Sequence, residues 1–320
     1  MVNVGIIGCG KVATAHINAL LKIPEAKISA VCDVDEERCR KFAEKTCANA
    51  YTSYEEMTDK ENLGLVIICL PPAFHGACVR YCAEKKINVF VEKPMGIDVS
   101  DCRSMIEACE QNGVMLWVGH MQCYSEENVI AKELIASGKY GDLISINEVR
   151  TCRYPGPVSP KWLMNKAVSG GGILYNFGAH TLDMVKYITG SKVVSVQCGV
   201  SLHEEGTENA ASGMLKLENG VSVTFNLMGN CDVNRYEITL YLSKGEIRII
   251  PRQSISVCGA NGAFETISGA SEEATGKSWQ YLQLCDVIEA TENKEAKVGG
   301  AYGLGIIQDL EMLYKSAGIM

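Results

Sequence analysis

Lys93 is one of two side chains whose sequence context predicts acid–base chemistry. It lies in the segment Val-Glu-Lys-Pro at residues 91–94, directly after an apolar run that predicts a buried strand. An ammonium group at the end of such a strand could hydrogen-bond a substrate oxygen and ease removal of its proton. Because most lysines are surface charges, position alone leaves that simpler role open.

His180 is the second candidate, in a predicted helix that follows three glycines at 170–172, a flexible entry to the helix. Asn176 stands four residues before it and Asp183 three residues after it. Side chains at these spacings share one helix face, so Asp183 could orient His180 towards a cleft. From this pattern alone, a structural role for the histidine is an equally good interpretation.

A third group of residues predicts a nucleotide-binding turn. The pattern Gly8-x-Gly10-x-x-Ala13 follows an apolar strand and opens a helix. Gly8 permits the tight turn, Gly10 leaves room for a pyrophosphate, and Ala13 lets the helix pack closely on the strand. The phosphates would lie at the helix N-terminus, which carries a partial positive charge.

An acid at the end of the second predicted strand indicates which dinucleotide binds. Asp33 follows that strand at close to the interval expected for a ribose-binding carboxylate. Its charge would repel a 2′-phosphate, and the next residue, Val34, is not basic. The sequence therefore favours NAD over NADP, with Asp35 as an alternative ribose ligand.

The predicted strand over residues 65–70 ends at Leu70 and is followed by Pro71 and Pro72. Ligands bind at the carboxyl edge of a parallel sheet, and the prolines could turn the chain towards a cofactor there. A plain end to the strand fits this feature equally well.

These groups need a scaffold, and the first part of the chain alternates predicted strands and helices. Helices are expected to begin at Asp35, at the pair Ser53 and Glu56, and at Ser100, and one is expected to end at Gly113. The strands are near-continuous apolar runs, as in a parallel sheet covered on both faces. They are residues 2–7, 28–32, 65–70, 88–91 and 114–118. This order predicts an α/β, doubly wound Rossmann domain.

The pattern changes after residue 120, where alternating strands become dominant. The expected strands are 144–150, 193–202, 211–217, 221–227, 235–242 and 246–250, and the expected helices are 126–137, 172–188, 279–292 and 303–316. Alternation predicts a large, open, mostly antiparallel sheet with one face on a core. We therefore expect a Rossmann domain over residues 1–120 and an α+β domain over 121–320. The terminal helix, about 303–316, is expected to pack back on the first domain.

The bulk composition limits the class of protein. The chain has 320 residues, of which 30 are basic and 38 acidic, giving a net charge of −8. A net negative charge repels polyanions, so neither nucleic acid nor an anionic membrane is an expected partner. No apolar run approaches the roughly 20 residues of a spanning helix, and the chain does not open on a signal peptide, so we expect a cytoplasmic protein.

The sequence also contains 15 cysteines, scattered and without a Cys-x-x-Cys pair. This distribution indicates buried thiols in a reducing compartment rather than disulfides or a zinc site. No group of His, Cys, Asp and Glu has metal-ligand spacing, so no metal site is expected.

In this order, the motifs resemble the Gfo/Idh/MocA oxidoreductases, the relatives of glucose–fructose oxidoreductase and inositol dehydrogenase. The matching segments are the turn from Gly8 to His16, Pro71-Pro72 with His75, Glu92-Lys93-Pro94, and the stretch from Gly170 to Asp183. Each piece alone is common, but the ordered combination is specific and covers nearly the whole chain.

The resemblance implies an enzyme that binds NAD(P) in its first domain and interconverts a secondary hydroxyl and a ketone in a cleft roofed by the second. Lys93 matches a lysine that contacts substrate and the nicotinamide ribose, and His180 matches the general base. Asn176 stands where the family often has aspartate, and an amide cannot carry charge or relay a proton. The residues expected to contact the cofactor are Gly8, Gly10, Lys11, Val12, Asp33, Leu70, Pro71, His75, Glu92 and Lys93.

The resemblance also bears on the substrate. The family often has an arginine in the segment that here is residues 120–124, and its absence favours a neutral sugar, sugar derivative or inositol. Gln122 and Trp162 are expected beside Asn176 and His180 as substrate-binding residues, although packing is an equally good role for Trp162.

Two alternative functions stay open. One is a glycoside-cleaving enzyme that retains its NAD and works through transient oxidation and elimination. The other is a catalytically silent NAD-binding sensor, for which Asn176 is the support. In all three cases we expect a homodimer or homotetramer formed through the semi-apolar second face of the C-terminal sheet, as is common in the family.

Overall fold

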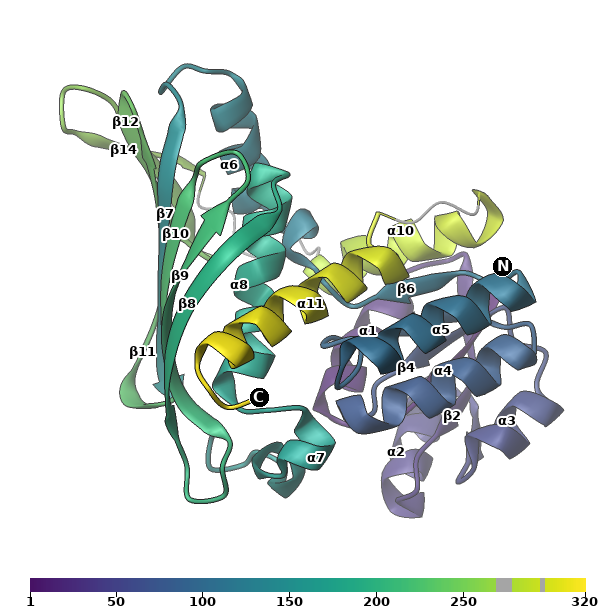
Figure 1. Cartoon of the computed structure of the whole chain (residues 1–320). Coiled ribbons are helices and arrows are strands. Elements are labelled where there is room, and N and C mark those ends of the chain that lie inside the picture. The colour runs from purple at the N-terminus through teal and green to yellow at the C-terminus, as the bar shows by residue number, and fades with distance from the viewer. Residues whose placement is uncertain (269–277, 294–296) are drawn as a thin grey trace. The chain divides into compact units, whose positions relative to one another are not determined.

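The computed structural model describes residues 1–268, 278–293 and 297–320, which form two compact units (Figure 1). The first unit comprises Met1–His120 and Ser278–Ile307, and the second comprises Met121–Lys277 and Gln308–Met320. Neither unit is therefore a single stretch of sequence. Residues 278–307, which we expected in the second domain, group with the first unit.

The first unit contains a six-stranded parallel sheet, sheet A, in the order β3-β2-β1-β4-β5-β6. Its strands are β1 (Val2–Ile7), β2 (Ala26–Cys32), β3 (Asn49–Tyr51), β4 (Leu65–Ile68), β5 (Asn88–Val91) and β6 (Leu116–Val118). This is the doubly wound order, in which the winding reverses between β1 and β4. The predicted Rossmann fold is confirmed, and only the three-residue β3 was missed.

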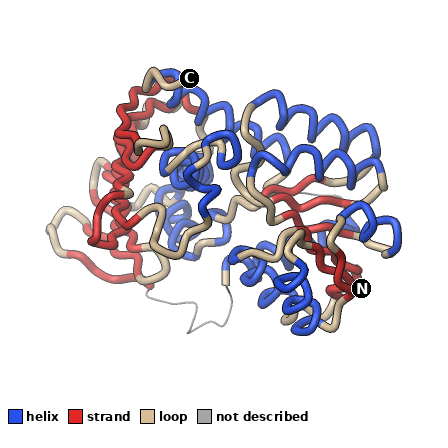
Figure 2. The backbone as a smooth tube through the Cα atoms, turned by 90° about the horizontal axis from the view of Figure 1, so that it is seen from below, coloured by secondary structure: helices blue, strands red, loops and turns tan. Residues whose placement is uncertain are grey.

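Helices lie on both faces of sheet A, as Figure 2 shows. They are α1 (Lys11–Leu20), α2 (Glu36–Thr46), α3 (Tyr54–Lys60), the 3-10 turn η1 (Pro72–Phe74), α4 (His75–Glu84), α5 (Val99–Asn112) and α10 (Trp279–Asn293). The predicted caps Asp35 and Ser53 are confirmed, since each side chain accepts a backbone N–H of its helix. Ser100 was wrong as a helix start, because Asp98 caps α5 through the N–H of Asp101.

The helix α10 belongs to the first unit because its apolar side chains complete that unit's core. Leu284, Val287 and Ile288 are buried in one cluster with Ile6 of β1 and Ile17 of α1. Burial of such side chains stabilises the fold by roughly 2 kcal/mol each.

The second unit contains sheet B, in the order β14-β13-β12-β11-β7-β10-β9-β8. Its strands are β7 (Leu143–Arg153), β8 (Val193–Leu202), β9 (Glu208–Leu217), β10 (Ser222–Met228), β11 (Asn230–Leu242), β12 (Gly245–Ile250), β13 (Ser254–Cys258) and β14 (Phe264–Ser268). All neighbours pair antiparallel except β10 with β7. The predicted open, mostly antiparallel sheet is confirmed, with the two short strands β13 and β14 missed.

The helical elements that group with sheet B lie on one of its faces, as Figures 1 and 2 show. They are η2 (Gln122–Tyr124), α6 (Glu126–Ala136), η3 (Lys161–Met164), α7 (Lys166–Ser169) and α8 (Ile173–Thr189). The helix α8 packs on β9 and β10, where Val223, Phe225 and Leu227 are buried on the inner face. The terminal helix α11 (Gly300–Ser316) groups with the first unit as far as Ile307 and with the second from Gln308. Among the described residues, none of these helices is both long and apolar enough to cross a membrane.

Candidate functional site

The turn after β1 is shaped by its two glycines. Gly8 has φ +91, and a Cβ there would lie 2.7 Å from the carbonyl oxygen of Cys69. Around Gly10, by contrast, a Cβ would meet nothing within 4 Å. Gly10 precedes α1, and no side chain caps that helix. The first N–H groups of α1 can thus donate to an anion from outside the protein, and the backbone at Gly10 leaves space for that anion.

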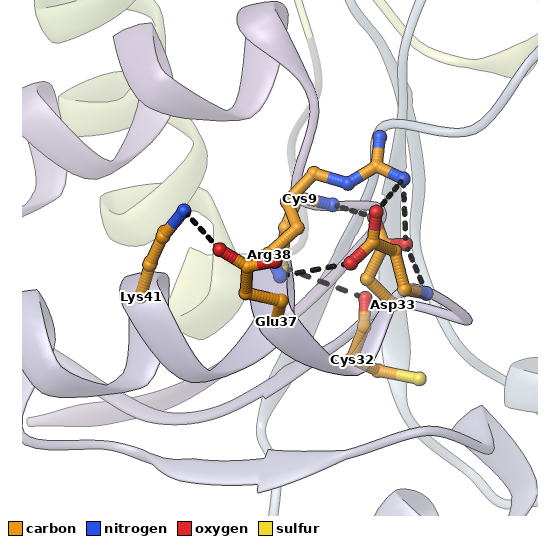
Figure 3. Close-up of polar contacts among 7 residues, drawn as sticks. Cys9, Cys32, Asp33, Glu37, Arg38 and Lys41 are labelled. Carbon is orange, nitrogen blue, oxygen red and sulfur yellow. Dashed lines mark hydrogen bonds and ion pairs between the residues drawn. The ribbon is translucent and has the colours of Figure 1, made fainter.

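Asp33 is held against this turn by the backbone. Its Oδ2 accepts the N–H of Cys9 at 2.7 Å (Figure 3), and its Oδ1 accepts the N–H of Asp35 at 2.9 Å. The carboxylate is almost fully buried. The structure therefore brings Gly8, Gly10 and Asp33 together at one point, whereas Lys11 and Val12 are exposed on the first turn of α1.

Arg38 is a residue of this region that the sequence analysis missed. Its Nη2 lies 3.4 Å from Asp33 Oδ1 (Figure 3) and 3.2 Å from Asp35 Oδ2. Asp35 also accepts the backbone N–H of Arg38 at 3.0 Å, so its carboxylate caps α2. The spacing of three residues between Asp35 and Arg38 in a predicted helix could have indicated this contact.

His75 connects the segments that follow β4 and β5. Its Nε2 lies 2.7 Å from the carbonyl oxygen of Leu70, and its Nδ1 lies 3.1 Å from that of Met95. The ring is fully buried, and burial lowers its pKa despite these carbonyl contacts. Both ring nitrogens thus face backbone carbonyl groups. This arrangement indicates a structural role for His75, which holds Leu70 in place. Pro71, partly exposed, follows Leu70 and directly precedes η1.

Glu92, directly after β5, forms a buried pair with His16 of α1. The two side chains meet at 2.6 Å between Glu92 Oε1 and His16 Nε2, and Glu92 Oε2 accepts the N–H of Lys93 at 3.0 Å. Burial opposes ionisation of Glu92, but His16 and Lys93 outweigh it, and the pKa of Glu92 is lowered. This carboxylate therefore fixes the backbone of Lys93, whose side chain is partly exposed.

In the second unit, the glycine run before α8 is tightly packed. A Cβ on Gly171 would lie 1.9 Å from the hydroxyl oxygen of Tyr314, and one on Gly172 would lie 2.2 Å from the backbone of Glu208. The N–H of Gly172 donates to Glu208 Oε2 at 2.6 Å. Our interpretation of the glycines as a flexible entry was therefore wrong. They admit close contacts that hold the start of α8 on the buried carboxyl of Glu208, which the sequence analysis missed.

The first half of α8 leaves one face open. Between Ile173 and Val185, only Asn176, Phe177 and His180 are not buried. Asn176 Nδ2 donates to the hydroxyl of Tyr154 at 3.1 Å, and the Tyr154 ring packs on Phe177 with centroids 5.1 Å apart. Burial raises the pKa of Tyr154 to about 12, so its phenol stays protonated at neutral pH. The structure thus places Asn176 and His180 on one partly exposed surface, with Tyr154 beside them.

Asp183 and Gln122 lie in the interior of the second unit. Asp183 is fully buried, and its Oδ2 accepts the N–H of Gln122 at 3.0 Å. The side-chain oxygen of Gln122 accepts from Asn128 at 2.8 Å. Trp162 is partly exposed in η3. Among the residues that the structure describes, no cluster of three or more His, Cys, Asp or Glu side chains is suited to a metal ion.

Comparison with known proteins places this geometry in a family. Residues 2–120 match the model of an oxidoreductase family with an NAD-binding Rossmann fold, and residues 129–248 match the GFO/IDH/MocA C-terminal domain. The chain is 30% identical to myo-inositol 2-dehydrogenase of Thermotoga maritima over 60% of this chain and 56% of that protein. It is 28% identical to an uncharacterized oxidoreductase, YrbE, of Bacillus subtilis over 86% of this chain and 73% of that one.

A solved structure shares the complete fold. The aldose-aldose oxidoreductase of Caulobacter crescentus, complexed with glycerol, superposes with a TM-score of 0.89 over 99% of this chain and 97% of that one, at 22% identity. Because the identity is low, this likeness concerns the fold alone.

Proposed function

The chain belongs to the GFO/IDH/MocA family of oxidoreductases, and we propose that it is an NAD-dependent enzyme that interconverts a secondary hydroxyl and a ketone on a sugar, a sugar derivative or an inositol. One observation carries the proposal: His180 is the only titratable side chain between Ile173 and Val185 of α8 that is not buried. A relative that is named a myo-inositol 2-dehydrogenase supports the substrate class.

The residues of the turn after β1 fit a dinucleotide. Open space above Gly10 and the uncapped start of α1 would receive the pyrophosphate, and Asp33 would accept hydrogen bonds from the ribose hydroxyls. When NAD is bound, its nicotinamide supplies the hydride acceptor or donor.

The side chains of the enzyme then handle the proton. In our proposal His180 takes the proton of the substrate hydroxyl during oxidation and returns it during reduction. Lys93 hydrogen-bonds the same oxygen and stabilises the charge that develops on it. Asn176 positions substrate or His180 without carrying charge. These roles rest on the family resemblance of the motifs around Lys93 and His180.

The preference for NAD over NADP would rest on Asp33. A 2′-phosphate would meet the buried carboxylate of Asp33, and repulsion between these anions would raise the free energy of the complex. Arg38, the nearest cation to Asp33, is engaged with Asp33 and Asp35. We therefore propose NAD as the physiological cofactor.

We also propose that the chain works as a homodimer or homotetramer assembled through the outer face of sheet B. Val194, Met214 and Tyr241 are large apolar side chains exposed on β8, β9 and β11. Exposed apolar area of this kind commonly marks an association surface. Sedimentation at micromolar protein is expected to show an oligomer, and a sharp monomer boundary would reject this part of the proposal.

The experiment that tests the function is a steady-state assay of NADH formation with a panel of inositols, aldoses and sugar acids. Steady turnover with added NAD is the expected result. The nucleotide that copurifies is identified in parallel, because a retained NAD that never exchanges would point to the eliminating alternative. Tight NAD binding without turnover on any compound would favour the sensor and contradict our proposal.

A further inference from the structure

The guanidinium of Arg150 lies against two aromatic rings on the inner face of sheet B. Its central carbon is 3.7 Å from the ring centroid of Phe177 on α8 and 4.6 Å from that of Tyr236 on β11. Arg150 and Tyr236 are direct partners in the antiparallel register of β7 and β11. Contact with two rings restricts the orientation of this flat cation.

Arg150 differs from the other arginines on the strands of sheet B. Arg153 pairs with Asp232, Arg235 pairs with Glu237, and Arg248 pairs with Glu246. Within the described part of the chain, Arg150 forms neither an ion pair nor a hydrogen bond. Its N–H donors are therefore not committed to a protein acceptor, although the side chain is half-buried.

The nearest acid on the same strand does not serve as a fixed counterion. Glu148 is fully buried, and neither of its carboxyl oxygens has a hydrogen-bond partner among the described residues. Burial raises the pKa of Glu148 to about 7, against the lowering influence of Thr181 and Arg150. Of the other groups that face this cluster, the Tyr236 phenol is held neutral because burial raises its pKa. Arg150 therefore keeps a positive charge that no bonded carboxylate balances.

The position of Arg150 connects it to the candidate site. Phe177, on which the guanidinium packs, follows Asn176 and precedes His180 by three residues, and these three are the residues between Ile173 and Val185 of α8 that are not buried. Tyr154, which accepts the hydrogen bond from Asn176, follows β7 four residues after Arg150 and packs on the same Phe177 ring. Arg150, Tyr154, Asn176 and His180 thus border one surface of the second unit.

We propose that Arg150 binds a carboxylate carried by the substrate, which makes the preferred substrate a sugar acid or a carboxylated cyclitol. This inference rests on the proposed function and replaces the neutral substrate expected from residues 120–124. A guanidinium presents parallel N–H donors that match the two oxygens of a carboxylate. A monoanion fits better than a phosphate dianion, because Glu148 stands close by on the same strand and one guanidinium cannot balance two charges.

The test compares substrates in matched pairs that differ only in the acid group, D-glucuronate with D-glucose and D-galacturonate with D-galactose. For wild-type protein with NAD, kcat/KM is expected to be roughly 10- to 100-fold higher for the acid in at least one pair. This is the gain expected from one hydrogen-bonded contact between charged groups. A wild-type enzyme that prefers the neutral member of both pairs would overturn the inference. So would a clear preference for D-glucose 6-phosphate over the acids.

Variants assign the preference to Arg150. Arg150→Met is expected to lower the acid-to-neutral ratio of kcat/KM by roughly 10- to 100-fold, mainly through the KM for the acid. Arg150→Lys, which keeps the charge but not the paired donors, should lie between Arg150→Met and wild type. Arg153→Gln is the matched control, because Arg153 is on the same strand but exposed and paired with Asp232, and it should leave the ratio unchanged. Circular dichroism checks the fold of each variant.

Equilibrium binding separates this inference from the function itself. If no compound is turned over, the proposed function fails, but calorimetric titration of the NAD-loaded protein with D-glucuronate and D-glucose still measures recognition. Tighter binding of the acid, lost in Arg150→Met and kept in Arg153→Gln, would support the carboxylate site without turnover. Equal binding of acid and neutral sugar, or equal loss of both in Arg150→Met, would refute it.

Discussion

Buried polar groups at two places in the molecule, the carboxyl edge of sheet A in the first unit and the cluster around Arg150 in the second, are bonded in different ways. In the first unit, the acids at the carboxyl edge of sheet A are fully engaged: Asp33 accepts two backbone N–H groups, and Glu92 pairs with His16 and Lys93. In the second unit, both carboxyl oxygens of Glu148 and the hydroxyl of Tyr236 lack hydrogen-bond partners among the described residues.

In our proposal, this difference arises because the first unit binds the cofactor and the second unit binds the substrate. A dinucleotide has fixed chemistry, so the groups that receive it can be held in place by the protein in advance. A substrate surface gains specificity from groups whose partners arrive with the ligand, because a wrong ligand leaves them unpaired. Buried charge and unmade hydrogen bonds at such groups lower the stability of the second unit.

The largest effect is expected at Glu92, where the comparison predicts a loss of stability. Glu92→Gln removes the charge from a buried pair and should lower the free energy of unfolding by roughly 3 kcal/mol at neutral pH. Because the pKa of Glu92 is lowered in the folded protein, its contribution is present above its ordinary pKa and is lost as pH falls through the folded value. Urea unfolding of wild type and variant near neutral pH and near pH 4 measures both the loss of stability and its dependence on pH. A variant as stable as wild type at neutral pH would contradict the account.

The contribution of Glu148 to the free energy of unfolding should change with pH in the opposite direction to that of Glu92. Its pKa is raised to about 7 in the folded protein, so its carboxyl favours folding only while it is protonated, and wild type loses that contribution as pH rises from the ordinary carboxyl range through about 7. Relative to wild type, Glu148→Gln should therefore become more stable by roughly 3 kcal/mol as the pH is raised to about 8.

The same urea titrations measure this change. Arg150 and Tyr236 lie near Glu148 and are the same in both proteins, so their own contributions to stability cancel in the difference. A stability difference that does not change with pH would show that Glu148 ionises normally.

At Asp33 the expected effect is a change of cofactor. Asp33→Ser removes the repulsion towards a 2′-phosphate and frees the guanidinium of Arg38, which lies 3.4 Å from the carboxylate in the wild type. The ratio of kcat/KM for NADP to that for NAD should rise roughly 30-fold, about 2 kcal/mol. In the double variant with Arg38→Ala, most of this gain should disappear. An unchanged ratio in the single variant would show that Asp33 does not face the ribose.

The smallest effect is expected at Asn176. Asn176→Asp adds a charge beside His180 and stabilises its imidazolium form, so the acidic limb of the kcat/KM profile for oxidation should move to higher pH. The hydroxyl of Tyr154 can then donate to residue 176 instead of accepting from it, which keeps the contact. Asn176→Ala serves as the control for loss of that contact. A limb that does not move in Asn176→Asp would place residue 176 out of electrostatic reach of His180.

The sequence predicted the elements better than it predicted the partners of their side chains. Strand and helix periods located the Rossmann order and the antiparallel sheet, because those patterns are local. Residues 278–307 group with the first unit because Leu284 is buried in one hydrophobic cluster with Ile6 and Ile17, which no local pattern predicts.

At the candidate site too, the sequence predicted individual residues but not the contacts between distant parts of the chain. Asp33, Lys93 and His180 were predicted from motifs, and the structure gives their surroundings. Tyr154, Arg150 and Glu208 were missed because their importance comes from contacts across strands and loops, not from their neighbours in the chain. Alternation along β7 could have placed Arg150 on the inner face of sheet B, but not against Phe177.

The most direct test of the central claim, that His180 is the base for NAD-dependent oxidation, is the pH profile of kcat/KM in His180→Ala with the best substrate of the panel. His203→Ala is the matched control, since His203 lies outside α8. The account predicts a loss of roughly 1000-fold at neutral pH and disappearance of the acidic limb seen in wild type, with both features kept in His203→Ala. A His180→Ala enzyme that keeps the limb and loses less than about tenfold would contradict it.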